Sequence, residues 1–301
     1  MNTKEEITGW FMTLQDNICA ALETEDGKGK FIEDNWERAE GGGGRTRIIQ
    51  HGNVIEKGGV LFSAVHGPVP DFLRNENAIS GEQLHTFYAT GVSIVIHPSN
   101  PMVPIIHMNV RYFEMSTGVW WFGGGIDLTP HYVDEEDARF FHGALKTSCD
   151  KHDAGFYPEF KKWADDYFFI NHRNETRGIG GIFFDKLSAT PEISKEQRFA
   201  FIQEIGNTFA PVYTRLMNKN KVKIYSEEHK QWQLLRRGRY VEFNLVYDKG
   251  TKFGLETNGR TESILMSLPE TAGWHYNYLP TPGSAEEHTL SFLKKAIAWA
   301  S

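Results

Sequence analysis

The sequence predicts an α+β fold, with a large, mostly antiparallel β-sheet flanked on both faces by α-helices. Candidate strands follow one another between residues 59 and 122, whereas most candidate helices come after residue 134. Strands and helices therefore do not alternate regularly, as they would in a doubly wound parallel sheet. No internal repeat, linker or composition break divides the chain, so we expect a single domain over residues 1–301.

Composition places the chain among globular proteins and excludes several classes. Of its 301 residues, 40% are hydrophobic and 24% charged, and the formal charge of −7 argues against a nucleic-acid partner, which usually meets a basic face. No stretch approaches the ~18 consecutive apolar residues of a transmembrane helix. The N-terminus lacks a signal-peptide pattern, and the only two cysteines, Cys19 and Cys149, exclude a disulfide scaffold. We therefore expect a cytoplasmic protein.

The N-terminal half predicts one helix followed by strands. Thr3 and Glu6 have the spacing of a capping box, and apolar residues recur at helical intervals from Ile7 to Leu22. The polar, Gly-rich stretch 23–53 predicts a loop with short strands at most. Longer strands are expected at residues 59–65, 92–97, 105–114 and 119–122.

The C-terminal half is expected to contain mostly helices, over residues 134–151 and 158–172 and from Ser194 and Ser284 onward. Acidic residues 134–137 suit the positive end of a helix dipole. Residues 179–184 predict a strand. Apolar and polar residues alternate over 239–247, which predicts another strand, with a turn at 248–250 leading to a further one.

Two neighbouring strands carry the most informative polar pattern. Alternate side chains of a strand share a face, so His107, Asn109 and Arg111 lie together, as do Ser93 and His97. If residues 98–104 form a simple hairpin loop, a symmetric register sets His97 opposite His107, Val95 opposite Asn109 and Ser93 opposite Arg111. We interpret this polar face as the floor of a site; plain solvent exposure is the alternative.

Two Gly-rich stretches add candidate ligand contacts. Gly41–Gly44 precede Arg45 and Arg47, which suggests a flexible anion clamp, although such a run can also be only a mobile loop. In residues 120–127, two tryptophans and a phenylalanine meet three glycines and then Asp127, a surface suited to a flat, conjugated or macrocyclic ligand. Arg260 adds another guanidinium. These residues together favour an anionic, partly flat substrate, because arginine grips carboxylates in bidentate fashion.

Four histidines raise the question of a metal. His142 and His172 each fall on an apolar row of a predicted helix, and a buried structural role is the plainer interpretation of each. Together with His97 and His107 they can instead coordinate a divalent metal, for which imidazole is a common ligand.

At these residues the sequence closely resembles the oxygen-dependent coproporphyrinogen III oxidase family, in the compact form of its bacterial members. The resemblance covers nearly the whole chain, in the runs GGGGRTR (41–47), GVSIVIHPSNP (91–101), HMNVRYFE (107–114), WWFGGGIDLTP (120–130), KKWADDYFFINHRNETRGIGGIFFD (161–185), RRGRYVEFNLVYDKGTKFGL (236–255) and GRTESILMSLP (259–269).

The resemblance implies an activity and its participants. The family converts two propionate side chains of coproporphyrinogen III to vinyl groups in haem synthesis, consuming O₂ and releasing CO₂, and the product is protoporphyrinogen IX. It implies a homodimer whose dimerisation segment matches residues 240–275 and no organic cofactor, and it leaves open whether a divalent metal is bound.

Site residues carry over position by position. The resemblance implies substrate contacts at Ser93, Asn109, Val110, Arg111, Gly259 and Arg260. It implies an acid/base role for His107 and a role in handling the pyrrole for Asp127, which we expect to contact pyrrole N–H groups. Arg111 is expected to anchor a reacting propionate. Metal ligands are implied at His97, His107, His142 and His172.

Two alternatives of other classes stay open at this point. A non-haem metal-dependent oxygenase would use the histidines directly, and would favour two histidines with one carboxylate. A non-catalytic tetrapyrrole-binding protein would bind tightly without releasing CO₂.

Overall fold

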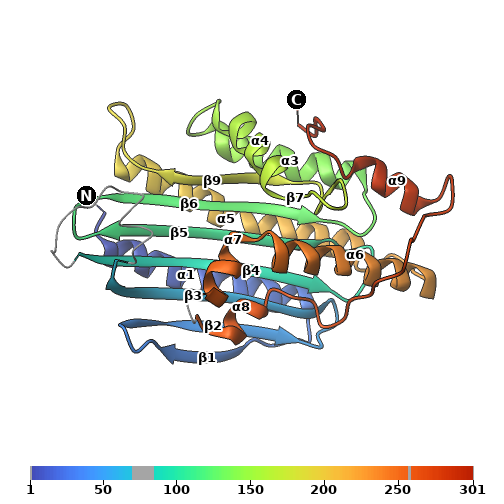
Figure 1. The fold of residues 1–301 in the computed structure, drawn as a ribbon, viewed down its shortest axis with the longest axis horizontal. Coiled ribbons are helices and arrows are strands. Elements are labelled where there is room, and N and C mark those ends of the chain that lie inside the picture. Colours follow the sequence, from blue (N-terminus) through green and yellow to red (C-terminus); the bar gives the residue numbers. More distant parts are fainter. Residues whose placement is uncertain (1, 70–84, 257–258, 301) are drawn as a thin grey trace.

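A seven-stranded antiparallel sheet forms the centre of the computed structural model, which describes residues 2–69, 85–256 and 259–300. The strand order is β1-β2-β3-β4-β5-β6-β9 (Figure 1). The strands are β1 (Ile32–Glu37), β2 (Gly42–Gln50), β3 (Ile55–Pro68), β4 (Thr86–Pro98), β5 (Ile105–Met115), β6 (Trp120–Thr129) and β9 (Gly181–Leu187). The short strands β7 (Phe169–Ile170) and β8 (Glu175–Thr176) form a separate hairpin.

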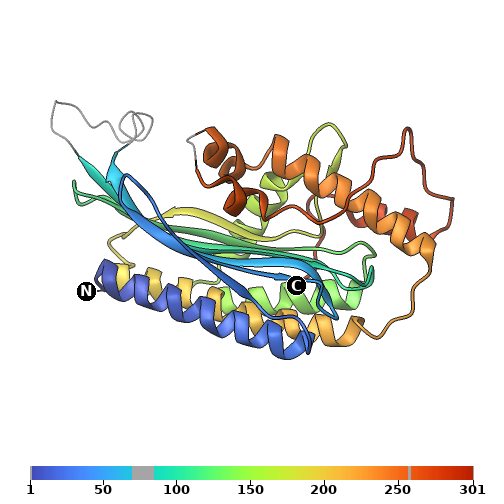
Figure 2. The ribbon, with the colours of Figure 1, turned by 90° about the horizontal axis from the view of Figure 1, so that it is seen from below.

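Helices cover both faces of this sheet, which confirms the α+β prediction. Figure 2 shows α1, α3 and α5 under one face and α6, α7 and α8 over the other. The helices are α1 (Lys4–Asp26), α3 (Glu135–Asp150), α4 (Phe156–Tyr167), α5 (Lys195–Asn220), α6 (Glu227–Val246), α7 (Lys249–Glu256), α8 (Thr261–Leu265) and α9 (Ala285–Phe292). Within the described ranges, no helix combines the length and the apolar character that crossing a membrane needs.

The sheet has a core face and a polar face. The core face packs against α1, α3 and α5, and its strands contribute fully buried apolar side chains such as Ile94, Ile106 and Met108. Because side chains alternate along a strand, His107, Asn109 and Arg111 point to the other side, toward α6 and α7. We call this second side the polar face.

The register between β4 and β5 differs by two residues from the symmetric hairpin that the sequence suggested. Val95 lies opposite His107, Ser93 opposite Asn109 and Gly91 opposite Arg111. The pairing ends at Ile96–Ile106, since the connection contains its own turn, in which the amide of Val103 bonds to Asn100. A shift of two residues keeps every side chain on its face, so the predicted polar face survives the error.

The expectation of mostly loop between residues 23 and 53 was wrong, since β1 and β2 are full strands. The glycines here fit strand packing. A Cβ at Gly43 would lie 2.2 Å from the carbonyl oxygen of Trp36, and one at Gly44 would lie 2.3 Å from the Trp36 ring. Gly43 and Gly44 therefore allow β1 to approach β2 closely, and the glycine run is part of the sheet instead of the flexible clamp that was expected.

The predicted strand at 239–247 was also wrong, because this segment is the end of helix α6, and α7 follows where a turn and strand were expected. Most of the residues that α6 buries recur at helical spacing: Trp232, Leu235, Arg236, Arg239, Tyr240, Phe243 and Asn244. Several of them are polar, which hides the helical period from a hydrophobicity pattern. Leu245, one of the apolar residues of the apparent alternation, is exposed on the helix surface. The predicted helix at 158–172 is shorter, ending at Tyr167.

Candidate active site

Three neighbouring strands assemble the predicted site on the polar face. Across β5 and β6, His107 lies opposite Asp127, Asn109 opposite Gly125 and Arg111 opposite Gly123. Ser93 of β4 borders Asn109 on the other side. The structure thus brings Ser93, His107, Asn109, Arg111 and Asp127 together on one face of the sheet. Val110, also predicted as a substrate contact, is fully buried on the core face, so its side chain does not reach this site.

His107, Asp127 and Arg177 form a hydrogen-bonded chain. The Nδ1 atom of His107 lies 2.8 Å from Oδ1 of Asp127, and Nη2 of Arg177 lies 2.8 Å from both oxygens of the same carboxylate. Asp127 and Arg177 are 1% and 3% exposed, whereas a fifth of the His107 side chain reaches the surface. His107 is therefore the member of the chain that a ligand can meet.

The electrostatics of the chain fix the tautomer of His107. Burial alone would raise the pKa of Asp127, but the charges and hydrogen bonds of Arg177 and His107 outweigh it and hold that pKa below its ordinary value. An ionised carboxylate only accepts hydrogen bonds, so the His107 Nδ1–H donates to it. The lone pair of Nε2 is then the available base, and among the described residues no partner contacts this nitrogen.

Arg177 was missed by sequence reasoning. Its guanidinium lies 4.4 Å from the ring centre of Phe168, 4.7 Å from that of Tyr240 and 4.6 Å from that of Phe243, and Nη1 donates to Asn244 over 2.9 Å. Such a cage stabilises a buried cation. The sign of this role in the sequence is that Arg177 stands among glycines. One of them, Gly178, lies so close to β6 that a Cβ there would be 2.3 Å from the backbone of that strand.

Arg111 occupies the other end of the polar face. Its Nη1 donates to Oδ1 of Asn109 over 2.7 Å, and Nη2 lies 2.9 Å from Oδ1 of Asp185 on β9. About a third of each charged side chain is exposed, 37% for Arg111 and 31% for Asp185. Asp185 is a second site residue that the sequence analysis did not single out.

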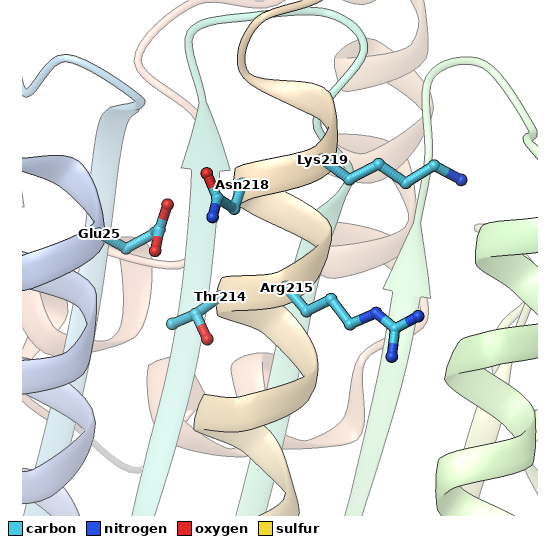
Figure 3. A pocket seen from close by; sticks show the side chains of 5 residues that line it. All are labelled: Glu25, Thr214, Arg215, Asn218 and Lys219. Carbon is cyan, nitrogen blue, oxygen red and sulfur yellow. The ribbon is translucent and has the colours of Figure 1, made fainter.

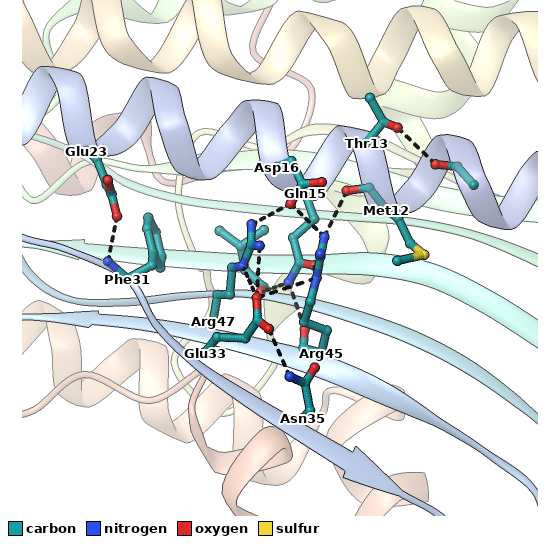
Figure 4. A network of polar contacts seen from close by, with 12 residues as sticks. Met12, Thr13, Gln15, Asp16, Glu23, Phe31, Glu33, Asn35, Arg45 and Arg47 are labelled. Carbon is teal, nitrogen blue, oxygen red and sulfur yellow. Dashed lines mark hydrogen bonds and ion pairs between the residues drawn. The ribbon is translucent and has the colours of Figure 1, made fainter.

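Arg45 and Arg47 are not part of this site. Both lie on β2 and point to the core-face side, where Asp16 of α1 and Glu33 of β1 hold them in a network (Figure 4). Their distances to Asp16 are 2.7 and 2.6 Å. The two arginines therefore bind the sheet edge to α1, and the structure separates them from the polar face by the thickness of the sheet.

Gly259 and Arg260 lie just before α8, over the β1–β2 edge of the polar face. The guanidinium of Arg260 is paired with Asp34 of β1. Thr46 of β2 contacts Ser263 of α8 over 3.1 Å, which fixes this short helix to the same edge. The pair Gly259–Arg260 is thus on the polar-face side of the sheet, but its arginine is paired at β1, away from Arg111.

The four histidines implied as metal ligands do not fit one metal centre in this chain. His142 uses both ring nitrogens on Tyr157 and on the Ile179 carbonyl, within the core-face layer. His172 bonds to Tyr247 and Glu242. His97 contacts the Ser267 carbonyl over 2.9 Å and His107 contacts Asp127. Nowhere in residues 2–69, 85–256 and 259–300 do three or more His, Cys, Asp or Glu side chains form a cluster able to hold a metal ion.

A pocket of about 500 Å³ lies away from the polar face, around the C-terminal part of α5 and beside the end of α1 (Figure 3). Its lining is polar and consists of Glu25, Thr214, Arg215, Asn218 and Lys219. It contains neither the His107 chain nor an aromatic surface for a flat ligand, so its position does not compete with the polar face.

The chain is similar to known proteins over nearly its whole length. A family model described as coproporphyrinogen III oxidase matches residues 6–299. A Drosophila melanogaster protein, the oxygen-dependent coproporphyrinogen-III oxidase, is 50% identical over 99% of this chain and 78% of its own length. The protein of the same name from Prochlorococcus marinus is 45% identical over 99% of this chain and 91% of its own length. The chain therefore belongs to the coproporphyrinogen III oxidase family.

Proposed function

We propose that the polar face is where this protein carries out its family's reaction, the oxidative decarboxylation of coproporphyrinogen III to protoporphyrinogen IX in haem biosynthesis. Both relatives carry the same name, oxygen-dependent coproporphyrinogen-III oxidase, and O₂ is accordingly the co-substrate. The observation that carries the assignment is the chain His107–Asp127–Arg177, which lies on the same face as Arg111. It supports a base and a carboxylate anchor on one face of the sheet, four residues apart along β5.

The reaction sets clear requirements for the site. Each propionate loses its carboxylate as CO₂ and one hydrogen from the carbon next to the pyrrole, and a vinyl group forms. Two electrons and a proton pass to O₂, which with one further proton becomes hydrogen peroxide. The electron-rich macrocycle supplies the electrons, so the protein must orient the propionate and manage protons.

The geometry supports one role for each residue. Arg111 anchors the propionate, with Ser93 and Asn109 beside it on the same face. His107 Nε2 exchanges the proton. Asp127 is a positioning residue that acts through His107, because its oxygens are occupied by Arg177 and His107 and it is 1% exposed. This burial does not support the expected direct contact with pyrrole N–H groups.

The test compares His107→Gln with the unchanged protein in aerobic and anaerobic assays that follow CO₂ and porphyrin fluorescence. Loss of the base is expected to lower kcat by about 10²- to 10⁴-fold with a smaller change in KM. His288→Gln, at an exposed histidine of α9, is the matched control and should keep full activity. Full turnover by His107→Gln would overturn the assignment, and tight binding without CO₂ release would instead favour a tetrapyrrole carrier.

We include no metal and no organic cofactor in this proposal. The separate surroundings of His97, His142 and His172 support structural roles for their rings, so no step depends on a metal. Full activity after rigorous chelation is expected. Loss of activity on chelation, restored by one metal, would favour a metal-dependent oxygenase.

We also propose a homodimer, formed through the segment 240–275 and its neighbours. Exposed apolar side chains gather along this part of the chain, at Leu245, Val246, Leu255, Trp274 and Leu279. Sedimentation equilibrium that gave only monomer at micromolar concentration would contradict the homodimer.

We propose a cytoplasmic location as well, and the two free, buried cysteines support it.

A further inference from the structure

The ladder between β6 and β9 contains an irregularity beside Arg111. Between two in-register pairs, the single residue Gly123 of β6 faces two residues of β9, Asp185 and Lys186. Lys186 has a φ of 52°, in the left-handed region that residues other than glycine rarely adopt. Bulges of this kind re-aim side chains and are frequent beside active sites.

The bulge places the Asp185 carboxylate against Arg111, across the backbone of β6. Oδ1 of Asp185 lies 2.9 Å from Nη2 of Arg111, and the backbone N–H of Lys186 donates to the same oxygen over 2.9 Å. A Cβ at Gly123 would lie 2.4 Å from that oxygen and 2.9 Å from Nη2. The bulge, the left-handed Lys186 and the glycine thus all accommodate one ion pair.

The ion pair has a consequence for an incoming substrate. Arg111 is the proposed propionate anchor, yet in this structure its Nη2 already faces a carboxylate. A second carboxylate at the same guanidinium would meet the negative charge of Asp185 at close range. Since both side chains are partly exposed, Asp185 can be displaced without unfolding the strand.

We propose that Asp185 is an exchangeable positioning carboxylate for Arg111, an inference that rests on the proposed function. In the empty site it holds the guanidinium over Gly123. A substrate propionate takes its place at Arg111, and when that carboxylate leaves as CO₂, Asp185 pairs with Arg111 again. The exchange breaks no covalent bond. The exchange favours release of the converted side chain, because the reaction removes the propionate carboxylate that competed with Asp185 for Arg111.

The test measures binding of coproporphyrin III, the stable oxidised form of the substrate that keeps its propionates, by fluorescence titration. Asp185→Asn removes the competing charge and should tighten binding about 2- to 5-fold, the range of a partly exposed ion pair. Arg111→Ala should weaken binding. In the Arg111→Ala background, Asp185→Asn should have no effect, because Asp185 acts through Arg111.

Kinetics provide a readout that a merely structural role would not move. Asp185→Asn should lower KM without raising kcat, and Asp185→Ser should behave alike. Asp166→Asn, at an exposed acid paired with Lys162 and Lys295, makes the same change of net charge and should leave both constants unchanged.

The outcomes separate this inference from the proposed function. Weaker or unchanged binding by Asp185→Asn, with Arg111→Ala binding weakly, overturns the exchange and leaves Arg111 as the anchor. The exchange is also overturned if Asp185→Asn changes binding equally in the unchanged protein and in the Arg111→Ala variant. Unchanged binding by Arg111→Ala contradicts the anchor itself, and with it both proposals.

Discussion

At the scale of single residues, the polar face depends on one buried ion pair. Asp127 is ionised in spite of its burial because Arg177 contacts both of its oxygens, and Arg177 in turn is held among three aromatic rings. The pair is costly to bury but far more costly to break, since either charge alone would be left without compensation. His107, the proposed base, is therefore held in place by two residues that are almost completely buried.

Asp127→Asn tests this support. It leaves Arg177 buried without its counter-charge, so the free energy of unfolding in urea should fall by about 3 to 5 kcal/mol. The amide also no longer selects the His107 tautomer with a proton on Nδ1. The substitution should therefore lower kcat strongly and change KM less. The exposed Asp166→Asn, whose ion pairs are worth at most about 1 kcal/mol, is the control. An unfolding free energy as high as that of the unchanged protein would show that Arg177 does not need the carboxylate.

At the scale of elements, α6 is the helix that closes the polar face. It supplies Tyr240, Phe243 and Asn244 to the surroundings of Arg177, and it is tied to the sheet by the fully buried Arg237. Nη1 and Nη2 of Arg237 lie 2.7 and 2.9 Å from the two oxygens of Glu56 on β3, and Nη2 also donates to the Pro98 carbonyl. A bidentate pair fixes the helix in orientation as well as in distance.

Glu56→Gln should loosen this attachment. The buried guanidinium loses its charge partner, at a cost of about 3 kcal/mol. Amide hydrogen exchange should accelerate in α6 more than in α1, which packs on the other face. Glu40→Gln, at an exposed acid paired with Arg38, serves as the control. Uniform acceleration in all helices would mean that Glu56 stabilises the whole fold rather than the seating of α6.

At the scale of the whole molecule, buried histidines make stability depend on pH. Burial lowers the pKa of His97 and of His142 from 6.5 to about 3, against the weaker opposing effect of their backbone hydrogen bonds. Below pH 6.5 the unfolded chain binds protons at these rings, whereas the folded protein does not. Stability is therefore full above pH 6.5 and falls as the pH is lowered toward 3.

Urea denaturation at a series of pH values measures this dependence. Between pH 6 and 4 the free energy of unfolding should fall by roughly 1.4 kcal/mol per pH unit for each such histidine. His142→Gln removes one of them and should reduce the slope by about that amount. A slope that the substitution leaves unchanged would mean that His142 is protonated in the folded protein.

Local chemistry decided what the sequence could predict. The structure confirms the predictions that depend on neighbours in the chain. These are the capping at Thr3 and Ser194, the strand alternation from Ser93 to Arg111 and the sheet-and-helix class. Side-chain alternation also placed His107, Asn109 and Arg111 on one face, whatever the register.

Tertiary structure decided the rest, because the deciding partners lie far apart in sequence. Buried arginines hid the helical period of α6 behind an apparent strand pattern. Arg45 and Arg47 turned to α1 because Asp16 and Glu33 are there. Arg177 and Asp185 come from strands and loops joined to β6 only by folding, so the sequence by itself determined the fold class and the polar face, while only the folded chain showed which charges are paired on it.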